Sequence, residues 1–395
     1  MQQNAAWENY LNRNKRTKKF LNEARVTSIE EIFNMVETVV KYPSPLSIIK
    51  FVKKCTTSGI WVSHAALRFI LSILEFKNDK FLRLEHPLTQ RILSDVRDNI
   101  PIKESFITDP QIFNAIFMER QFYHIHSEQK AILEHPQIKS TIVLVDGVLN
   151  EIFSTSTFER TLKSLHEKYN IKYFIPKMDG LKCTSENANA LRVQIDEYIE
   201  HHPDEKLWII GYSKGGIDSL HYAYENSHFA SDHILGISTI ACPILGSEKF
   251  EHKILQIIRG IQSLNDKKSY KKIKSKKNFL YKDLMHSLDQ EVQGTWFKKN
   301  HKKLPSNLFY TALALESQWH ESHFWMMLTK ALFKSNQKND GVVNCESAQF
   351  PDYFKGINLG IVKGHHLIGT RSSFYSQEAL IESLIIFLKY KSFIY

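Results

Sequence analysis

The sequence predicts an α/β protein in which a mostly parallel sheet is flanked by helices, and three observations lead to this prediction. From residue 139 onward, short runs rich in β-branched and aromatic residues alternate with stretches whose apolar residues recur every three or four positions. One of these runs ends in a glycine-rich turn that contains a serine and leads into a helical stretch. Hydrophobic residues make up 43% of the 395 residues and charged residues 24%, values typical of a globular protein with a sizeable core.

Residues 1–130 are predicted to form a helical N-terminal region. The run SIEEIFNMVETVVKY has helical apolar spacing, and Ser28 and Glu31 have the spacing of a capping box. A second run, DPQIFNAIFMERQFYHIHSEQKAILEH, begins at Asp109. Because no nucleophile, phosphate-loop or metal-ligand pattern occurs in these 130 residues, we expect the region to pack on the rest of the chain without supplying catalytic groups.

Residues 139–395 are predicted to form the α/β domain. Six strands are expected in the runs STIVLVDG, IKYFIP, KLWIIG, HILGISTIA, NLFYTALAL and INLGIVKG. Strands that alternate with helices form parallel sheets covered on both faces, and such sheets bind ligands at the carboxyl ends of their strands. Functional residues are therefore expected directly after these runs.

Charge is concentrated in one segment of the chain. The net charge is +10, and residues 251–303 contain 14 basic side chains against 5 acidic ones. Such a segment attracts an anionic surface, and the alternative is a solvated run that aids solubility. Nucleic-acid binding is disfavoured, because Tyr270 is the only aromatic residue interleaved with the lysines and no reader motif occurs.

The sequence shows no export signal and no membrane span. The N-terminal residues MQQNAAWENYLNRNKRTKKF lack an apolar core, and no run of roughly 18 uninterrupted apolar residues occurs. The four cysteines lie far apart, so we expect neither zinc nor a disulfide framework. We therefore expect a cytoplasmic protein, with peripheral contact to an anionic membrane as the further expectation from its basic segment.

The stretch KLWIIGYSKGGIDSL places Ser213 on a strand-to-helix turn. The pattern Gly211-Tyr212-Ser213-Lys214-Gly215 is that of a nucleophile elbow, in which tight backbone packing requires the glycines and the serine Oγ projects from the carboxyl edge of the sheet. The backbone N–H of Lys214, at the start of the helix, is then the natural donor to an oxyanion. A structural serine in a glycine-rich turn is the alternative; the Gly-Lys-Ser/Thr order of a phosphate loop is absent.

A serine nucleophile needs a base, usually a histidine that is oriented by a carboxylate. The stretch KNDGVVNCESA presents Asp340 in a polar turn, which is also the sequence of an ordinary Asp-Gly turn. The stretch INLGIVKGHHLIGT places His365 and His366 after a predicted strand, and a pair of surface histidines would look the same. Asp352, in FPDYF, is the reserve acid. A serine, an acid and a histidine thus occur in that order, each in a loop.

These motifs resemble the α/β-hydrolase superfamily and, within it, lipases and esterases. NDGVV is similar to the Asp-Gly pair at the catalytic acid of those enzymes, and HHLIG is similar to the His-Leu pair at their catalytic base. The resemblance covers about residues 139–395 and implies that Ser213 is the nucleophile, Asp340 the orienting acid and His366 the base. It implies no cofactor and no metal.

The resemblance extends to the oxyanion hole and to a lid. TIVLVDGVLNE resembles the lipase strand and its His-Gly-X loop, with Asp146-Gly147 in place of His-Gly, so the backbone N–H of Val148 is the second expected oxyanion donor beside that of Lys214. A strand that simply ends in an Asp-Gly turn is the alternative. Residues 247 to about 304 lie where lipase-like enzymes carry a lid, and the run FEHKILQIIRGIQSL within them has helical apolar spacing.

The function expected from these residues is that of a serine hydrolase which cleaves carboxylic esters, of lipid or acylated substrates, through an acyl-serine intermediate. An acyltransferase would use the same triad with another acceptor. A binding protein without catalytic activity, which uses the hydrolase fold as a scaffold and the basic insertion to hold a partner, is the alternative from a different class. The three ordered motifs favour the enzyme.

Overall fold

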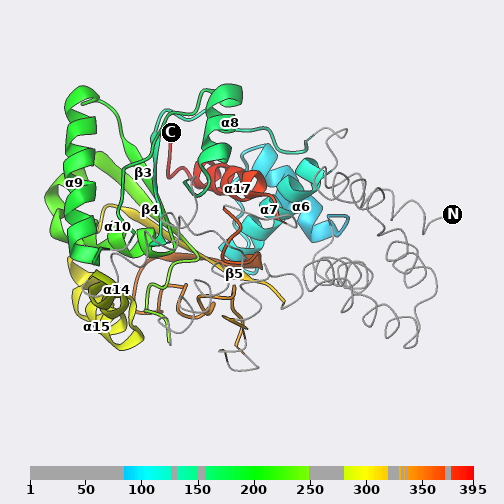
Figure 1. Ribbon diagram of the computed structural model, residues 1–395. Helices are drawn as coiled ribbons and strands as arrows, with labels where there is room; N and C mark the ends of the chain where they lie inside the picture. The colour runs from blue at the N-terminus through cyan, green and yellow to red at the C-terminus, as the bar shows by residue number, and fades with distance from the viewer. Residues whose placement is uncertain are drawn as a thin grey trace, which may run out of the picture.

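The computed structural model describes residues 84–125, 131–148, 156–180, 182–248, 280–318, 329–330, 333, 337–369 and 375–395. These residues form three layers, with helices on both faces of a central sheet (Figure 1). The predicted α/β fold class is confirmed. Three predicted features lie outside the described residues: the apolar run FEHKILQIIRGIQSL of the lid, the lysine-rich stretch 265–277 and the run that begins at Ser28.

One sheet of six parallel strands forms the centre of the molecule. Its strands follow the order β2-β1-β3-β4-β5-β6 across the sheet. Each of the six predicted runs coincides with one of them, and β3 and β5 each extend one residue beyond the predicted run. The strands are β1 (Thr141–Val145), β2 (Tyr173–Phe174), β3 (Leu207–Tyr212), β4 (Ile234–Ile240), β5 (Phe309–Glu316) and β6 (Ile357–Lys363). The runs are continuous in apolar residues because a parallel sheet is buried on both faces.

The two faces of the sheet bury two separate hydrophobic clusters. In β1, Ile142 and Leu144 belong to one cluster, and Val143 and Val145 belong to the other, as the two-residue period of a strand requires. The first cluster includes buried residues of α6 (Pro87–Arg97), α7 (Asp109–Ile125), α8 (Glu159–Tyr169) and α17 (Gln377–Tyr390). The second includes residues of α9 (Thr184–His201), α10 (Lys214–Glu225), α11 (Ser227–His233), α14 (Leu280–Leu288) and α15 (Gln290–Asn300), the last followed by the short 3-10 helix His301–Lys303.

The strand order reverses at β1, and this reversal positions the site. After β1 the chain moves outward to β2, and it then returns to form β3 on the other side of β1. The helix after β1, α8, covers one face, whereas the helix after β3, α10, covers the other. The loops that leave β1 and β3 therefore diverge at the carboxyl edge of the sheet, which is the edge where open α/β sheets bind ligands.

The described part of the predicted N-terminal region packs directly on the α/β domain. Helix α7 lies against α17 and β6, as Figure 1 also shows for α7 and α17. Buried charges link the two helices: Arg120 of α7 donates to Glu119, and its guanidinium lies 3.6 Å from the carboxylate of Glu382 on α17. The division of the chain near residue 130 stays a prediction.

The described end of the predicted lid, residues 280–303, belongs to the helical layer over the second cluster. Leu284 and Leu288 of α14 and Phe297 of α15 are fully buried there. His221 of α10 stacks on Trp296 of α15, with ring centroids 3.5 Å apart. A lid function for residues 247–304 stays a prediction.

Candidate active site

The turn that carries Ser213 lies between β3 and α10. Ser213 has φ 53° and ψ −127°, a conformation that residues other than glycine rarely adopt and that the surroundings must hold in place. Its N–H donates to the carbonyl of Ile240, at the end of β4, at 2.9 Å. Gly215 lets the turn pack on β1, because a Cβ there would lie 2.1 Å from the carbonyl oxygen of Val145. The serine is therefore held at the carboxyl edge of the sheet.

Ser213, His366 and Asp340 are joined by hydrogen bonds. Ser213 Oγ lies 2.8 Å from His366 Nε2, and His366 Nδ1 lies 2.7 Å from Asp340 Oδ2. When Nδ1 is protonated, the ring donates to the carboxylate and Nε2 is left to accept the serine proton. The exposed fraction is 6% for Ser213 and 1% for each of the other two residues, so little water competes for these hydrogen bonds.

The turn after Asn339 holds the Asp340 carboxylate in one orientation. Asp340 Oδ1 accepts hydrogen bonds from the backbone N–H groups of Val342 at 2.9 Å and Val343 at 2.8 Å. The carboxylate thus uses one oxygen to close its own Asx turn and presents the other to His366. The backbone N–H of His366 also donates to the Asp340 carbonyl at 2.9 Å, which fixes the two loops against each other.

The structure distinguishes the two histidines and the two acids that the sequence offered. The His365 ring has other partners: its Nδ1 accepts from the backbone N–H of Leu367 at 3.1 Å, and the ring lies edge-on to Tyr375. Asp352 is exposed on a separate turn, where no contact with His366 is recorded. The structure therefore brings together the three residues selected for the triad, and their catalytic roles stay predictions.

The loop after β1, which carries the expected oxyanion donor Val148, passes next to the turn of Ser213 and Lys214. A Cβ at Gly147 would lie 2.8 Å from Ser213 Cβ and 3.3 Å from the backbone nitrogen of Lys214, so the loop after β1 passes directly over the start of α10. Val148 follows in this loop and is buried. Asp146 accepts from the backbone N–H of Thr157 at 3.1 Å and so braces the far end of the same loop.

Three features of the site were not expected from the sequence. The Tyr212 hydroxyl donates to the backbone carbonyl of His366. Lys330 Nζ donates to the carbonyl of Asn339 at 2.9 Å and so supports the acid turn from outside. The side chain of Lys214 pairs with Asp218 inside the protein. The sequence signal for this last contact is the i, i+4 spacing of a lysine and an aspartate on one helix.

The described residues offer no group of three or more His, Cys, Asp or Glu side chains suited to hold a metal ion. None of their helices is long and apolar enough to cross a bilayer.

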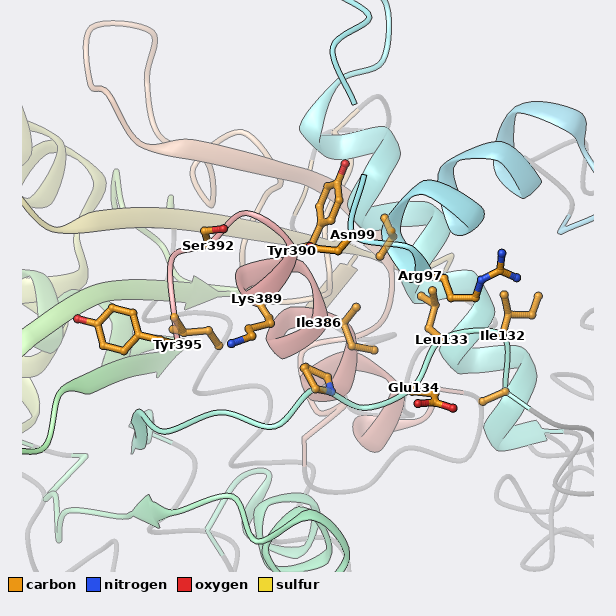
Figure 2. Close-up of a pocket in the computed structure, with 14 residues that line it drawn as sticks. Arg97, Asn99, Ile132, Leu133, Glu134, Ile386, Lys389, Tyr390, Ser392 and Tyr395 are labelled. Atoms are coloured by element: carbon orange, nitrogen blue, oxygen red, sulfur yellow. The ribbon is translucent and has the colours of Figure 1, made fainter. Parts of the chain in front are cut away.

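A cavity of about 760 Å³ lies at a different place from the triad (Figure 2). Its walls come from the C-terminal ends of α6 and α17 and from residues 131–136, which precede β1. Ile132, Leu133 and Ile386 form its apolar wall, as Figure 2 shows. None of the residues that line it belongs to the triad or to the expected oxyanion donors.

Comparisons with known proteins support the fold. No protein-family model matches the sequence, and neither does any curated protein. Among solved structures, the metagenomic carboxyl esterase MGS0156 matches with a TM-score of 0.53 and 19% identity, over 67% of this chain and 79% of the esterase.

Two further matches have TM-scores below 0.5. The mature Bacillus licheniformis lipase BlEst2 matches with a TM-score of 0.44 and 20% identity, over 66% of this chain and 94% of the lipase. The monoglyceride lipase of Saccharomyces cerevisiae matches with a TM-score of 0.40 and 11% identity, over 66% of this chain and 88% of the lipase. The likeness to the esterase, together with the six-stranded parallel sheet, shows an α/β-hydrolase fold.

Proposed function

We propose that this chain is a serine hydrolase that cleaves carboxylic esters through an acyl-serine intermediate. The observation that carries the proposal is the hydrogen-bonded series Ser213, His366 and Asp340, with distances of 2.8 Å and 2.7 Å. A carboxylate that orients a histidine, which in turn contacts a serine on a strained turn, is the arrangement that acyl transfer requires. The α/β-hydrolase fold supports the proposal as an analogy.

In the first half of the reaction, Ser213 Oγ attacks the ester carbonyl carbon while its proton passes to His366 Nε2. The carbonyl π electrons move to oxygen, and the backbone N–H groups of Lys214 and Val148 are assigned to receive this oxyanion. The tetrahedral intermediate then collapses: the bond to the alkoxy oxygen breaks, and His366 returns its proton to the leaving alcohol. Asp340 stabilises the imidazolium in between without taking the proton.

In the second half, water replaces the alcohol. It attacks the acyl carbon and gives its proton to His366 Nε2, and the bond from the acyl carbon to Ser213 Oγ then breaks as that proton returns to the serine. A carboxylic acid is released. An acyltransferase would differ only in this half, because an acceptor alcohol would take the place of water.

Lipid or acylated compounds are the substrate class we assign, and contact with an anionic membrane is part of the same proposal. The support is the basic composition of residues 251–303 and the place of this segment as an insertion within the predicted α/β domain, residues 139–395. Each lysine near an acidic bilayer contributes about 1 kcal/mol of binding free energy, so four or five lysines together give useful membrane affinity.

The test of the proposed function is labelling with a fluorophosphonate probe, which reports an activated serine without knowledge of the substrate. The wild-type protein should label at a single site, and Ser213→Ala should not label while it keeps the wild-type circular dichroism spectrum. Wild-type protein that remains unlabelled, or a Ser213→Ala variant that labels at the wild-type rate, would contradict the proposal. The former result would favour the noncatalytic binding protein.

A further inference from the structure

The residue that follows the nucleophile carries a buried charge. Lys214 Nζ donates to both carboxylate oxygens of Asp218, one turn further along α10, at 2.8 Å each. Both side chains are 1% exposed. Asn187 of α9, which is also buried, donates to Asp218 Oδ2 at 2.8 Å. A charged network therefore lies inside the protein within one helical turn of Ser213.

The stability of α10 does not account for this arrangement. A cation at the N-terminal end of a helix opposes the helix dipole, so Lys214 occupies an unfavourable position. A lysine that precedes its acidic partner by four residues is also the weaker order of such a pair. Finally, a buried ion pair commonly stabilises a fold no more than apolar side chains of similar volume would. Helix stability therefore does not explain why Lys214 and Asp218 occupy these positions.

The network connects the two segments that carry the expected oxyanion donors. Through Asp218 and Asn187, Lys214 is tied to α9. The residues that lead into α9 pack in turn on the loop after β1: a Cβ at Gly180 would lie 2.8 Å from Val148 Cα. The network therefore braces the start of α10 against the same helical segment that supports the Val148 loop.

We propose that Lys214 and Asp218 are positioning residues that hold the backbone N–H of Lys214 where it receives the oxyanion. The inference rests on the proposed function, because it assigns the pair a part in the same reaction. The Lys214 side chain anchors its own peptide group: with its ammonium held at Asp218, the first residue of α10 cannot rotate its N–H away from the position assigned to the oxyanion. The effect of the pair is on the tetrahedral intermediate and not on the bound ester.

The experiment replaces the pair by apolar residues, Lys214→Met/Asp218→Leu, which leaves no buried charge unpaired. We measure kcat and KM with a short p-nitrophenyl ester, and we express kcat per serine labelled by the fluorophosphonate. We also measure the affinity for a boronic acid that forms a tetrahedral adduct with the serine. We expect kcat to fall by about 10- to 100-fold. This decrease is smaller than, or close to, the decrease in kcat caused by removal of a whole oxyanion donor. KM should stay unchanged, and boronic acid affinity should fall with kcat/KM.

A matched control replaces an ion pair away from the site, Lys391→Met/Asp109→Leu, whose Nζ and Oδ1 lie 3.0 Å apart between α17 and α7. This variant should keep the wild-type kcat per labelled serine. If Lys214→Met/Asp218→Leu does not fold, Asp218→Asn replaces it, with the same directions expected for kcat and for boronic acid affinity.

A purely structural pair would give a different result. In that case the melting temperature of the variant changes, whereas kcat per labelled serine and boronic acid affinity remain at wild-type values, and the inference is overturned although the proposed function stands. Wild-type protein that does not label with the fluorophosphonate would overturn both.

Discussion

The hydroxyl of Tyr212 donates a hydrogen bond to the backbone carbonyl of His366, and the two rings stack with centroids 5.6 Å apart. Tyr212 precedes the nucleophile in the chain, so this contact joins the serine turn to the histidine loop. Burial raises the pKa of Tyr212 well above its ordinary value, with Asp340 and Asp146 adding to the effect, so the hydroxyl stays protonated and can donate.

Tyr212→Phe should therefore lower both stability and activity. The buried carbonyl of His366 loses its donor, which we expect to cost about 1–3 kcal/mol in the free energy of unfolding, measured by denaturant titration. Activity on a p-nitrophenyl ester should fall several-fold because the base loses one support. Tyr222→Phe is the control, since the buried Tyr222 hydroxyl has no hydrogen-bond partner among the described residues. Equal stability losses in the two variants would show that the Tyr212 hydrogen bond is unimportant.

The assignment of base and acid can be checked by paired single substitutions. His366→Ala and Asp340→Asn should each lower kcat by about 10³-fold or more, since they remove the base or its orienting group. His365→Ala and Asp352→Asn should retain most of the activity per labelled serine. The assignment of the base reverses if His365→Ala is inactive and His366→Ala is nearly normal, and loss of activity at Asp352 but not at Asp340 reverses the acid.

The elbow should not tolerate a side chain at Gly215. The Cβ of Gly215→Ala would lie 2.1 Å from the Val145 carbonyl oxygen, a backbone atom that cannot move without displacing β1. We expect this variant to lose fluorophosphonate labelling and to melt at a lower temperature. In Gly294→Ala, on α15, the new Cβ meets, among the described residues, only the Leu245 carbonyl oxygen at 3.4 Å, so labelling should be normal. Normal labelling in both variants would mean that the turn is looser than the structure indicates.

Stability should depend on pH through His221. Burial is the main cause that lowers the pKa of His221 to about 3; the hydrogen bond with Gln293 opposes this shift, and the charge of Lys214 contributes to it. An unfolded histidine titrates near about 6.5. Between these values the unfolded chain binds a proton that the folded chain does not, so the free energy of unfolding decreases as the pH falls from about 6.5 towards 3.

His221→Phe keeps a ring against Trp296 and removes this titration. The free energy of unfolding, measured at pH 7.5 and at pH 5, should therefore decrease less in the variant than in the wild type, by up to about 1.4 kcal/mol per pH unit. An identical decrease in both proteins would indicate that the His221 ring is protonated in the folded state as readily as in the unfolded state.

The proposed membrane contact predicts a specific vesicle-binding pattern. Sedimentation with phospholipid vesicles should increase with anionic lipid content and decrease as salt is raised, because screening weakens the attraction. A variant with glutamine in place of the five lysines in the centre of the basic segment should bind more weakly; these are Lys271, Lys272, Lys274, Lys276 and Lys277. If this variant binds as well as the wild type, the docking role is wrong, and the hydrolase proposal is unaffected.

The sequence by itself determined the elements of the sheet and the place of the serine turn. The six β-rich runs each coincide with a strand to within one residue at the carboxyl end of β3 and β5, and the turn at Ser213 follows the strand that the run KLWIIG predicts. These features depend on local patterns: a buried parallel strand requires a continuous apolar run, and a tight strand-to-helix turn requires small residues at fixed offsets. Such constraints act within about ten residues and are therefore visible in one sequence.

Only the tertiary structure decided which neighbours meet across the sheet. His365 and His366 are adjacent in the chain and equivalent in local pattern, yet His366 Nε2 lies within hydrogen-bond distance of Ser213 Oγ, whereas His365 Nδ1 accepts from the backbone N–H of Leu367. The Tyr212 hydroxyl reaches His366 over 154 positions in the chain, and Asn187 reaches Asp218 from another helix. Contacts of this kind depend on how layers pack, which leaves no periodic signal in the sequence.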